Sequence, residues 1–298
     1  MVKLGRLLTA MVTPFTEDGE VDYEQAKKLA LALLRSGSDG LVVSGTTGES
    51  PTLTKEEKLR LFTEVKEAIG DRGSVVAGTG NYSTRESIEL TREAERVGVD
   101  AVLLVVPYYN KPTQQGLLEH FKAIASSTSL PCILYNVPSR TITSLSVDTM
   151  VKLSQIDNIV GLKEASGNLS QATELLSQVS QDFLLYSGND GDTFPLLCLG
   201  GYGVISVASH LVGRQIKQLI ERVVGGEIES AAAIHRNLLP LFKALFILSN
   251  PIPVKYALNQ VGFRVGPTRL PLTPPDEKAA ALISETLKNY KIDLPLAE

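Results

Sequence analysis

Few residues of this sequence are of the kinds that bind metals, form cross-links or attract nucleic acids. Two cysteines and three histidines occur among 298 residues, and the 29 Lys and Arg are outnumbered by 33 Asp and Glu. The net charge of −4 lacks the electrostatic signature of a nucleic-acid-binding protein. No apolar run approaches the ~20 residues that a membrane-spanning helix needs, and the first residues do not follow a signal-peptide pattern. These features predict a soluble, cytoplasmic protein.

The rare residues are also poorly placed for chemistry of their own. His120, His210 and His235 are widely separated, without an HExxH motif or a Cys/His pair, so we expect no zinc site. Cys132 and Cys198 lie in apolar segments, and we expect both to be reduced core residues. The sequence also lacks the G-x-x-x-x-G-K-[ST] phosphate loop and the G-x-S-x-G nucleophile elbow.

Short apolar segments alternate with longer amphipathic segments along most of the chain. Several of the short segments have no polar side, which is typical of parallel strands buried on both faces. We expect strands at 7–12, 40–44, 75–77, 101–106, 132–135, 159–162, 183–186 and 203–206. We expect helices between them at 23–35, 55–69, 84–97, 114–126, 147–153, 169–179, 193–199 and 214–223. Thr54 with Glu57, and Ser83 with Glu86, match the capping-box pattern of a helix start.

Eight consecutive strand–helix units predict an α/β fold of the (β/α)8 TIM-barrel type, in a chain somewhat longer than the usual ~250 residues. The remainder reads as helical, with segments 227–248, 253–261 and 276–290 separated by proline-rich turns. We therefore expect a catalytic barrel over 1–226 and a C-terminal helical extension over 227–298. A doubly wound open sheet gives the same alternation, but segment 78–83 lacks the third glycine of the dinucleotide fingerprint.

Polar residues collect where the expected strands end, which is the catalytic rim of barrel enzymes. Residues 45–49, Gly-Thr-Thr-Gly-Glu, follow the second strand and are called the GTTGE loop below. Its backbone N–H groups are suited to holding a carboxylate or phosphate, although a plain helix-capping turn has the same composition. Tyr108 and Tyr109 follow the fourth strand between two prolines and suit either proton relay or packing.

The fifth and sixth strands end in a tyrosine and a lysine. Tyr135 closes one strand and Arg140 follows five residues later, which pairs a general acid/base with a carboxylate anchor unless the arginine is merely a surface residue. Lys163 directly follows the apolar residues 159–162, so its ammonium is expected in the barrel mouth. Partial desolvation favours the neutral amine, which attacks ketones to form a Schiff base. The alternative is an ordinary exposed lysine at the end of a strand. The tyrosine and the anion-binding loop on adjacent strand ends favour a Schiff-base site instead.

These motifs together resemble the dihydrodipicolinate synthase family, within the pyruvate-dependent aldolases that include N-acetylneuraminate lyase. The resemblance runs along the whole chain and is carried by the GTTGE loop, Tyr-Asn-Val-Pro-Ser-Arg-Thr at 135–141 and Gly-Leu-Lys-Glu at 161–164. It implies a lyase that condenses pyruvate with L-aspartate 4-semialdehyde in the diaminopimelate route of lysine biosynthesis. The reaction runs through a covalent imine with pyruvate and needs no metal or organic cofactor.

The resemblance also implies catalytic roles for four residues. Lys163 forms the imine, Tyr135 transfers protons, and Thr46 links Tyr135 to Tyr109 in a proton relay. Tyr109 comes from a neighbouring subunit, so we expect a homo-oligomer, commonly a tetramer of two tight dimers.

Four further residues are implied in substrate binding. The backbone of Thr47, together with that of Thr46, holds the pyruvate carboxylate, and Arg140 meets the carboxylate of the aldehyde. Ile205 lines the pyruvate pocket through its carbonyl, and Gly188 contacts the second substrate.

One departure from the family pattern concerns feedback inhibition. Lysine-inhibited members carry histidines in the helix after the GTTGE loop and an asparagine after Gly-Thr-Gly. Lys55, Lys58 and Tyr82 occupy those places here, while Ser50 and Glu86 are kept. Two cations repel the ammonium of an inhibitory lysine, so we expect weak or absent lysine feedback.

Two alternative functions stay open from the sequence. A related aldolase acting on a 2-keto-3-deoxy sugar acid or N-acetylneuraminate keeps the imine chemistry, but Arg140 suits a short carboxylated aldehyde better. A barrel that binds a small anion without covalent chemistry, such as a sensor, is the rival from another class. A phosphate-sugar isomerase is more remote, because the late barrel loops lack a glycine-rich phosphate cradle.

Overall fold

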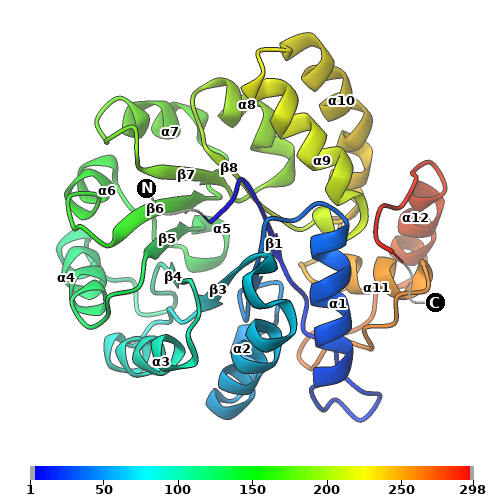
Figure 1. Cartoon of the computed structure of the whole chain (residues 1–298), viewed down its shortest axis with the longest axis horizontal. Helices are drawn as coiled ribbons and strands as arrows, with labels where there is room; N and C mark the ends of the chain where they lie inside the picture. Colours follow the sequence, from blue (N-terminus) through cyan, green and yellow to red (C-terminus); the bar gives the residue numbers. More distant parts are fainter. Residues whose placement is uncertain (1–3, 296–298) are drawn as a thin grey trace.

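Eight parallel strands close into a barrel in the computed structural model, which describes residues 4–295 (Figure 1). Each strand pairs with its neighbours in chain order, and the eighth pairs with the first. The strands are β1 (Leu7–Ala10), β2 (Gly40–Val43), β3 (Ser74–Gly78), β4 (Ala101–Val105), β5 (Cys132–Asn136), β6 (Ile159–Glu164), β7 (Leu184–Ser187) and β8 (Gly203–Ser206). Nearly every strand residue is buried. The prediction of a TIM barrel is confirmed.

Helices surround the strands and cover the outer face of the barrel (Figure 1). They are α1 (Tyr23–Arg35), α2 (Lys55–Ile69), α3 (Thr84–Val97), α4 (Gln114–Ala125), α5 (Pro138–Thr141), α6 (Val147–Leu153), α7 (Leu169–Leu176) and α8 (Thr193–Cys198). Short 3-10 turns occur at η1 (Ser50–Thr52), η2 (Gly70–Arg72) and η3 (Asp190–Asp192). The four-residue helix α5 was not predicted, because one turn is too short to give a helical period.

The predicted helix starts agree with the structure where a side chain caps the first turn. Thr54 and Glu57 form the complete capping box of α2, with both reciprocal hydrogen bonds present. At α3, Ser83 accepts from the N–H of Glu86, but the Glu86 carboxylate accepts from Asn81 instead of closing the box. The second capping box is therefore only half formed.

Two apolar layers hold the barrel together. One lies between the strands and the surrounding helices, and the other fills the barrel interior with side chains such as Leu8, Ile133 and Ile205. Tyr186 closes the interior at the end where the strands begin. There its hydroxyl donates to the carbonyl of Gly5 at 2.8 Å. The interior is therefore open for chemistry only at the carboxyl ends of the strands.

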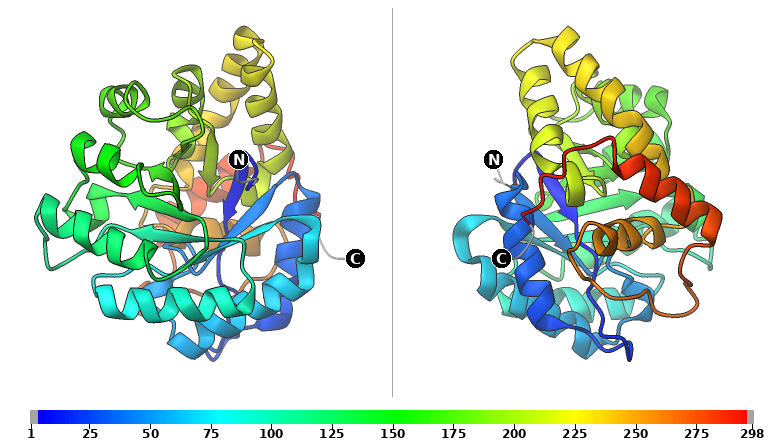
Figure 2. Two further views of the ribbon diagram at one scale, coloured as in Figure 1. Left: turned by 60° about the vertical axis from the view of Figure 1, so that its left-hand side comes forward. Right: turned by 90° about the vertical axis from the view of Figure 1, so that its right-hand side faces the viewer.

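Four helices follow the last strand: α9 (Ser209–Val224), α10 (Ile228–Ala244), α11 (Ile252–Gln260) and α12 (Glu277–Leu287). Helix α9 begins five residues before the expected start, because its first turn precedes a kink at Val212 that interrupts the helical period. Helices α10 and α11 each pack on α9 and on α12, along one side of the barrel (Figure 2). None of the helices within residues 4–295 is long and apolar enough to cross a membrane.

One expectation about the core is wrong. Cys132 is buried, and burial raises its pKa to about 12, but Cys198 is exposed. Cys198 ends the short helix α8, whose buried face is made by Thr193, Leu196 and Leu197. The apolar sequence around Cys198 belongs to that face and not to the cysteine.

Candidate active site

A cavity of about 200 Å³ lies at the carboxyl ends of strands β2 to β5. The residues that line it are Ser44, Gly45, Thr46, Ser50, Pro51, Gly78, Gly80, Leu103, Val105, Tyr108, Tyr135, Val137, Arg140 and Thr141. It therefore brings together the start of the GTTGE loop, Tyr135 near the carboxyl end of β5, and Arg140. Catalytic groups of TIM barrels gather at this end.

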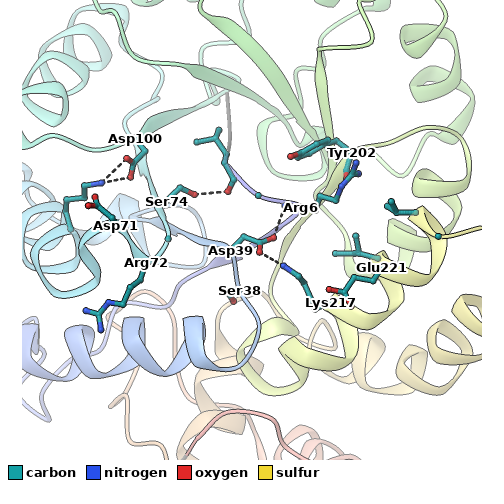
Figure 3. A pocket seen from close by; sticks show the side chains of 17 residues that line it. Arg6, Ser38, Asp39, Asp71, Arg72, Ser74, Asp100, Tyr202, Lys217 and Glu221 are labelled. Carbon is teal, nitrogen blue, oxygen red and sulfur yellow. Dashed lines mark hydrogen bonds and ion pairs between the residues drawn. The ribbon is translucent and has the colours of Figure 1, made fainter. Parts of the chain in front are cut away.

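A larger hollow of about 870 Å³ lies at the other end of the barrel, where the strands begin (Figure 3). Four of its charged side chains form two ion pairs: Asp39 accepts from Lys217 (Figure 3), and Lys66 donates to both carboxylate oxygens of Asp100 at 2.8 Å. The hollow lies at the end of the barrel opposite the one where the catalytic groups of TIM barrels gather.

Lys163 lies on β6 directly beside Tyr135 of β5, with which it is in register. Its side chain points into the barrel because it alternates with Leu162 and Glu164, and Ala165 on the same face belongs to the interior core. The Nζ atom lies 4.3 Å from the centre of the Tyr135 ring. Lys163 is 5% exposed and Tyr135 is 6% exposed, so the two groups face each other largely out of water.

Gly188 and Ile205 border the same part of the interior. A Cβ atom on Gly188 would lie 3.2 Å from Cε of Lys163 and 2.6 Å from Cβ of Ala165, so the glycine leaves room for the lysine side chain. Ile205 is fully buried on β8, inside the barrel.

A buried carboxylate lies at the carboxyl end of β7, where its charge interacts with Lys163. Asp190 accepts hydrogen bonds from the Ser206 hydroxyl and from the N–H groups of Val207 (3.0 Å) and Ala208 (2.9 Å). Burial raises the pKa of Asp190, while these hydrogen bonds and the charge of Lys163 oppose that shift. Asp190 was not predicted as a site residue, because it follows a strand in a polar turn of ordinary composition.

The GTTGE loop is held in place by several contacts. The Thr13 hydroxyl donates to the carbonyl of Gly48 at 2.7 Å, and Glu49 donates its N–H to the carbonyl of Thr46 at 3.1 Å. The N–H groups of Thr46 and Thr47 have no acceptor in the part of the chain that the structure describes. They are therefore available to an anion at the barrel mouth, as the loop composition predicts.

Backbone strain concentrates on the loops around this cavity. Within residues 4–295, the non-glycine residues with positive φ are Ser44, Glu49, Tyr109, Lys111 and Ile142. All five belong to the loops after β2, β4 and β5. Such strain costs about 1–3 kcal/mol per residue and is typical of functional sites.

Tyr108 and Tyr109 point in different directions. Tyr108 lines the cavity and packs edge-on against Tyr82, with the ring centres 5.2 Å apart, and burial raises its pKa. Tyr109 is 93% exposed and does not contact the cavity of its own chain.

Arg140 is exposed on helix α5 and lines the cavity. Its Nη2 donates to the carbonyl of Asn250 at 3.1 Å, and the side-chain amide of Asn250 donates to the Thr47 hydroxyl at 2.9 Å. The Asn250 Oδ1 atom is buried and has no partner among the described residues. Asn250 therefore joins the anion loop to Arg140, although the sequence indicates only a proline-rich turn there.

The residues expected to govern lysine feedback lie on several elements: Lys55 and Lys58 on α2, Glu86 on α3, Ser50 in η1 and Tyr82 in the loop before α3. Lys55 forms an ion pair with Glu93 at 2.5 Å. Burial lowers the pKa of Lys58, and the nearby carboxylate of Glu86 opposes that shift. Ser50 lines the cavity itself.

A search for known relatives agrees with this geometry. The model of the Dihydrodipicolinate synthetase family matches residues 3–290. The chain belongs to this family. A 4-hydroxy-tetrahydrodipicolinate synthase of Dehalococcoides mccartyi is 64% identical over 296 residues, which cover 99% of this chain and 100% of the relative. A synthase of Moorella thermoacetica is 57% identical, over 95% of this chain and 98% of the relative.

Solved structures of the family share the fold closely. The dihydrodipicolinate synthase of Cyanidioschyzon merolae with lysine bound is 49% identical and superposes with a TM-score of 0.95, covering 96% of this chain and 98% of that one. The enzyme of Acinetobacter baumannii complexed with pyruvate is 40% identical with a TM-score of 0.94, covering 96% and 99%. The predicted family and enzyme class are thereby confirmed: the chain has 4-hydroxy-tetrahydrodipicolinate synthase activity, a pyruvate-dependent lyase activity of lysine biosynthesis.

Proposed function

We propose that Lys163 carries the synthase reaction by forming an imine with pyruvate. The observation that supports this most strongly is the buried lysine at the carboxyl end of β6, with Nζ 4.3 Å from the Tyr135 ring centre. A lysine shielded from water is the group that attacks a ketone once it has lost its proton. The second substrate is L-aspartate 4-semialdehyde.

The steps balance without any redox partner. Nζ of Lys163 adds to C2 of pyruvate and the ketone oxygen leaves as water, which gives the imine. Loss of a methyl proton gives an enamine, whose carbon attacks the aldehyde carbon and forms the new C–C bond. The amino group of the semialdehyde then adds to C2 and displaces Lys163, which closes the ring and frees the enzyme.

The proton transfers are assigned to Tyr135, Thr46 and Tyr109. Tyr135 lies against Lys163, and Thr46 lines the same cavity as Tyr135. Tyr109 is 93% exposed on its own chain, which fits a side chain that reaches the site of a second copy.

Substrate carboxylates are assigned to two places. The free N–H groups of Thr46 and Thr47 hold the pyruvate carboxylate, and the planar guanidinium of Arg140 holds that of the semialdehyde. Ile205 lines the pyruvate pocket with its carbonyl, and Gly188 leaves room beside Lys163 where the second substrate enters.

The substrate assignment is tested by turnover. Pyruvate and L-aspartate 4-semialdehyde are supplied, and the product is consumed by a coupled reductase followed through nicotinamide absorbance. We expect robust turnover in the parent protein and at least a thousandfold loss in Lys163→Ala. Turnover with sugar-derived aldehydes, and none with the semialdehyde, would transfer the protein to the sugar-acid aldolases.

We further propose a homotetramer built from two tight dimers, with Tyr109 shared across each dimer. Tyr109→Phe and Lys163→Ala chains are each expected to be nearly inactive alone. Mixed and re-associated, they should recover roughly a quarter of parental turnover, because half of the dimers are mixed and one of two sites in each is complete. No recovery in verified mixed dimers would place Tyr109 outside the relay.

Lysine feedback is proposed to be weak or absent. The cations Lys55 and Lys58 lie at the start of α2, which follows the cavity-lining residues Ser50 and Pro51, and Lys58 is half-buried where its charge is poorly screened. Calorimetric titration with lysine should show no binding at millimolar concentrations. Tight binding would contradict the electrostatic argument.

A further inference from the structure

Helix α11, one of the C-terminal helices, places the buried ammonium of Lys255 against the GTTGE loop. Lys255 on α11 donates to Oε1 of Glu49 at 2.9 Å, and the two side chains are 2% and 1% exposed. The residues are 206 positions apart in sequence, so only the closed fold brings them together. Burial lowers the pKa of Lys255 to about 8, while the Glu49 carboxylate acts against that shift.

Every donor of the Lys255 ammonium is used. Besides Glu49, it donates to the carbonyl of Thr13 at 2.9 Å and to that of Pro267 at 2.6 Å. The ammonium also lies 4.2 Å from the centre of the Phe15 ring. Lys255 therefore ties together the loop after β1, the loop after β2 and the segment after α11.

Both oxygens of Glu49 are held by the C-terminal part of the chain. Oε1 accepts from Lys255, and Oε2 accepts from the backbone N–H of Arg269 at 2.9 Å. Arg269 is itself fixed, because its guanidinium pairs with Glu57 and donates to the carbonyls of Gly19 and Thr52. Glu49 adopts φ 57°, a left-handed conformation that a non-glycine residue holds only under such constraint.

Thr13 connects this cluster to the anion loop from the other side. Its carbonyl accepts from Lys255, and its hydroxyl donates to the carbonyl of Gly48 at 2.7 Å. Gly48 and Glu49 directly follow Thr46 and Thr47, whose N–H groups lack acceptors among residues 4–295. Gly48 and Glu49 are therefore one to three residues away from those N–H groups, and their positions constrain them through the backbone.

The energetics of buried ion pairs favour a positioning role over simple stabilisation. Removing two charges from water costs several kcal/mol per ion, and apolar replacement of such a pair is often neutral for stability. What the charged pair supplies is a fixed, directional geometry. The geometry is needed where the loop must present N–H groups to a carboxylate.

We propose that Lys255 and Glu49 are positioning residues for pyruvate: they fix the GTTGE loop so that its free N–H groups meet the substrate carboxylate. The C-terminal helices are then a working part of the active site as well as a cover on the barrel. This inference rests on the proposed function, since it assumes that pyruvate binds at this loop as the Lys163 imine.

The test measures the pyruvate concentration that gives half-maximal imine trapping by borohydride, together with KM and kcat in the coupled assay. The variants are Lys255→Met, Glu49→Gln, the double variant, and Thr13→Val, which removes only the hydroxyl that holds Gly48. Ile283→Ala is the matched control, because Ile283 is fully buried in α12 and is not one of the residues whose hydrogen bonds join Lys255, Glu49, Thr13 and Arg269. We expect it to lower thermal stability without disturbing the loop.

We expect each single charge variant to raise the pyruvate concentration for half-maximal trapping at least tenfold. Thr13→Val should raise it at least threefold. The KM for pyruvate should rise with it in each variant. The melting temperature of the double variant should lie closer to that of the parent than the melting temperature of either single variant does. Its pyruvate concentration for half-maximal trapping should nevertheless stay raised. Ile283→Ala should melt earlier with parental half-saturation. Parental half-saturation in the double variant or in Thr13→Val would overturn the inference. Absence of trapping in the parent would instead refute the proposed function.

Discussion

Acid should destabilise this protein in part through the buried histidine His210, whose ring is the more deeply buried of two with a strongly lowered pKa, the other being His120. The ring is fully buried, with Nδ1 2.8 Å from the carbonyl of Val207 and Nε2 3.1 Å from the backbone nitrogen of Val12. Nδ1 therefore donates and Nε2 accepts, which fixes the neutral ring. A second proton, on Nε2, would face the N–H of Val12, so two donors would point at each other. Burial of the ring lowers the pKa of His210 from 6.5 to about 4.

The sign and size of the change in stability follow from the difference between the pKa of His210 in the unfolded chain and in the folded protein. Between pH 6.5 and 4 the unfolded chain binds a proton at His210 and the folded chain does not, so the free energy of unfolding falls as pH falls. Each pH unit in this window is worth about 1.4 kcal/mol, which gives a loss of about 2 kcal/mol at pH 5 and about 3 kcal/mol below pH 4.

The measurement is urea unfolding followed by circular dichroism from pH 7.5 to 4.5, at one protein concentration, for the parent and for His210→Gln. Glutamine does not titrate, so the variant should lose about 2 kcal/mol less than the parent between pH 7 and pH 5. Other groups titrate equally in both proteins and cancel in the difference. Parallel curves for the two proteins would refute the assignment of a neutral, doubly hydrogen-bonded His210.

Three further predictions concern single substitutions. Gly188→Ala places a Cβ atom 3.2 Å from Cε of Lys163, so it should slow imine trapping about tenfold and lower the free energy of unfolding by about 1–3 kcal/mol. An unchanged trapping rate would show that the lysine does not need this space. Arg140→Lys loses the planar guanidinium, so KM for the semialdehyde should rise about tenfold while pyruvate trapping stays parental, and equal effects on both substrates would contradict its role. Thr54→Ala removes the capping box of α2 and should cost about 1 kcal/mol in urea unfolding, with parental turnover as the control.

Local chemistry explains which parts of the fold were predictable. Helix α1 begins at the expected residue because Asp22 caps it, and α2 because Thr54 and Glu57 form a capping box. Helix α10 ends at Ala244, four residues before the expected end, because turns lead into the Asn250–Pro251 bond and no residue pattern marks where they begin.

The candidate site was predictable where it depends on neighbouring strands. Tyr135 and Lys163 are the last but one residues of successive strands, and parallel pairing brings them into register. Contacts across the whole chain were not predictable, because nothing in the sequence near Asn250 or Lys255 points to Thr47 or Glu49. Those contacts exist only once the barrel has closed and the last helices have packed beside it.

The central claim, that Lys163 is the residue that binds pyruvate covalently, is tested most directly by locating the trapped adduct. The protein is reduced with borohydride in the presence of pyruvate, digested and mapped by mass spectrometry. Lys255, the other deeply buried lysine described here, is the internal comparison, since it is 2% exposed and tied to Glu49. We predict a single carboxyethyl group on Lys163 and none on Lys255. An adduct on any other lysine, or a full adduct in Lys163→Ala, would contradict the account.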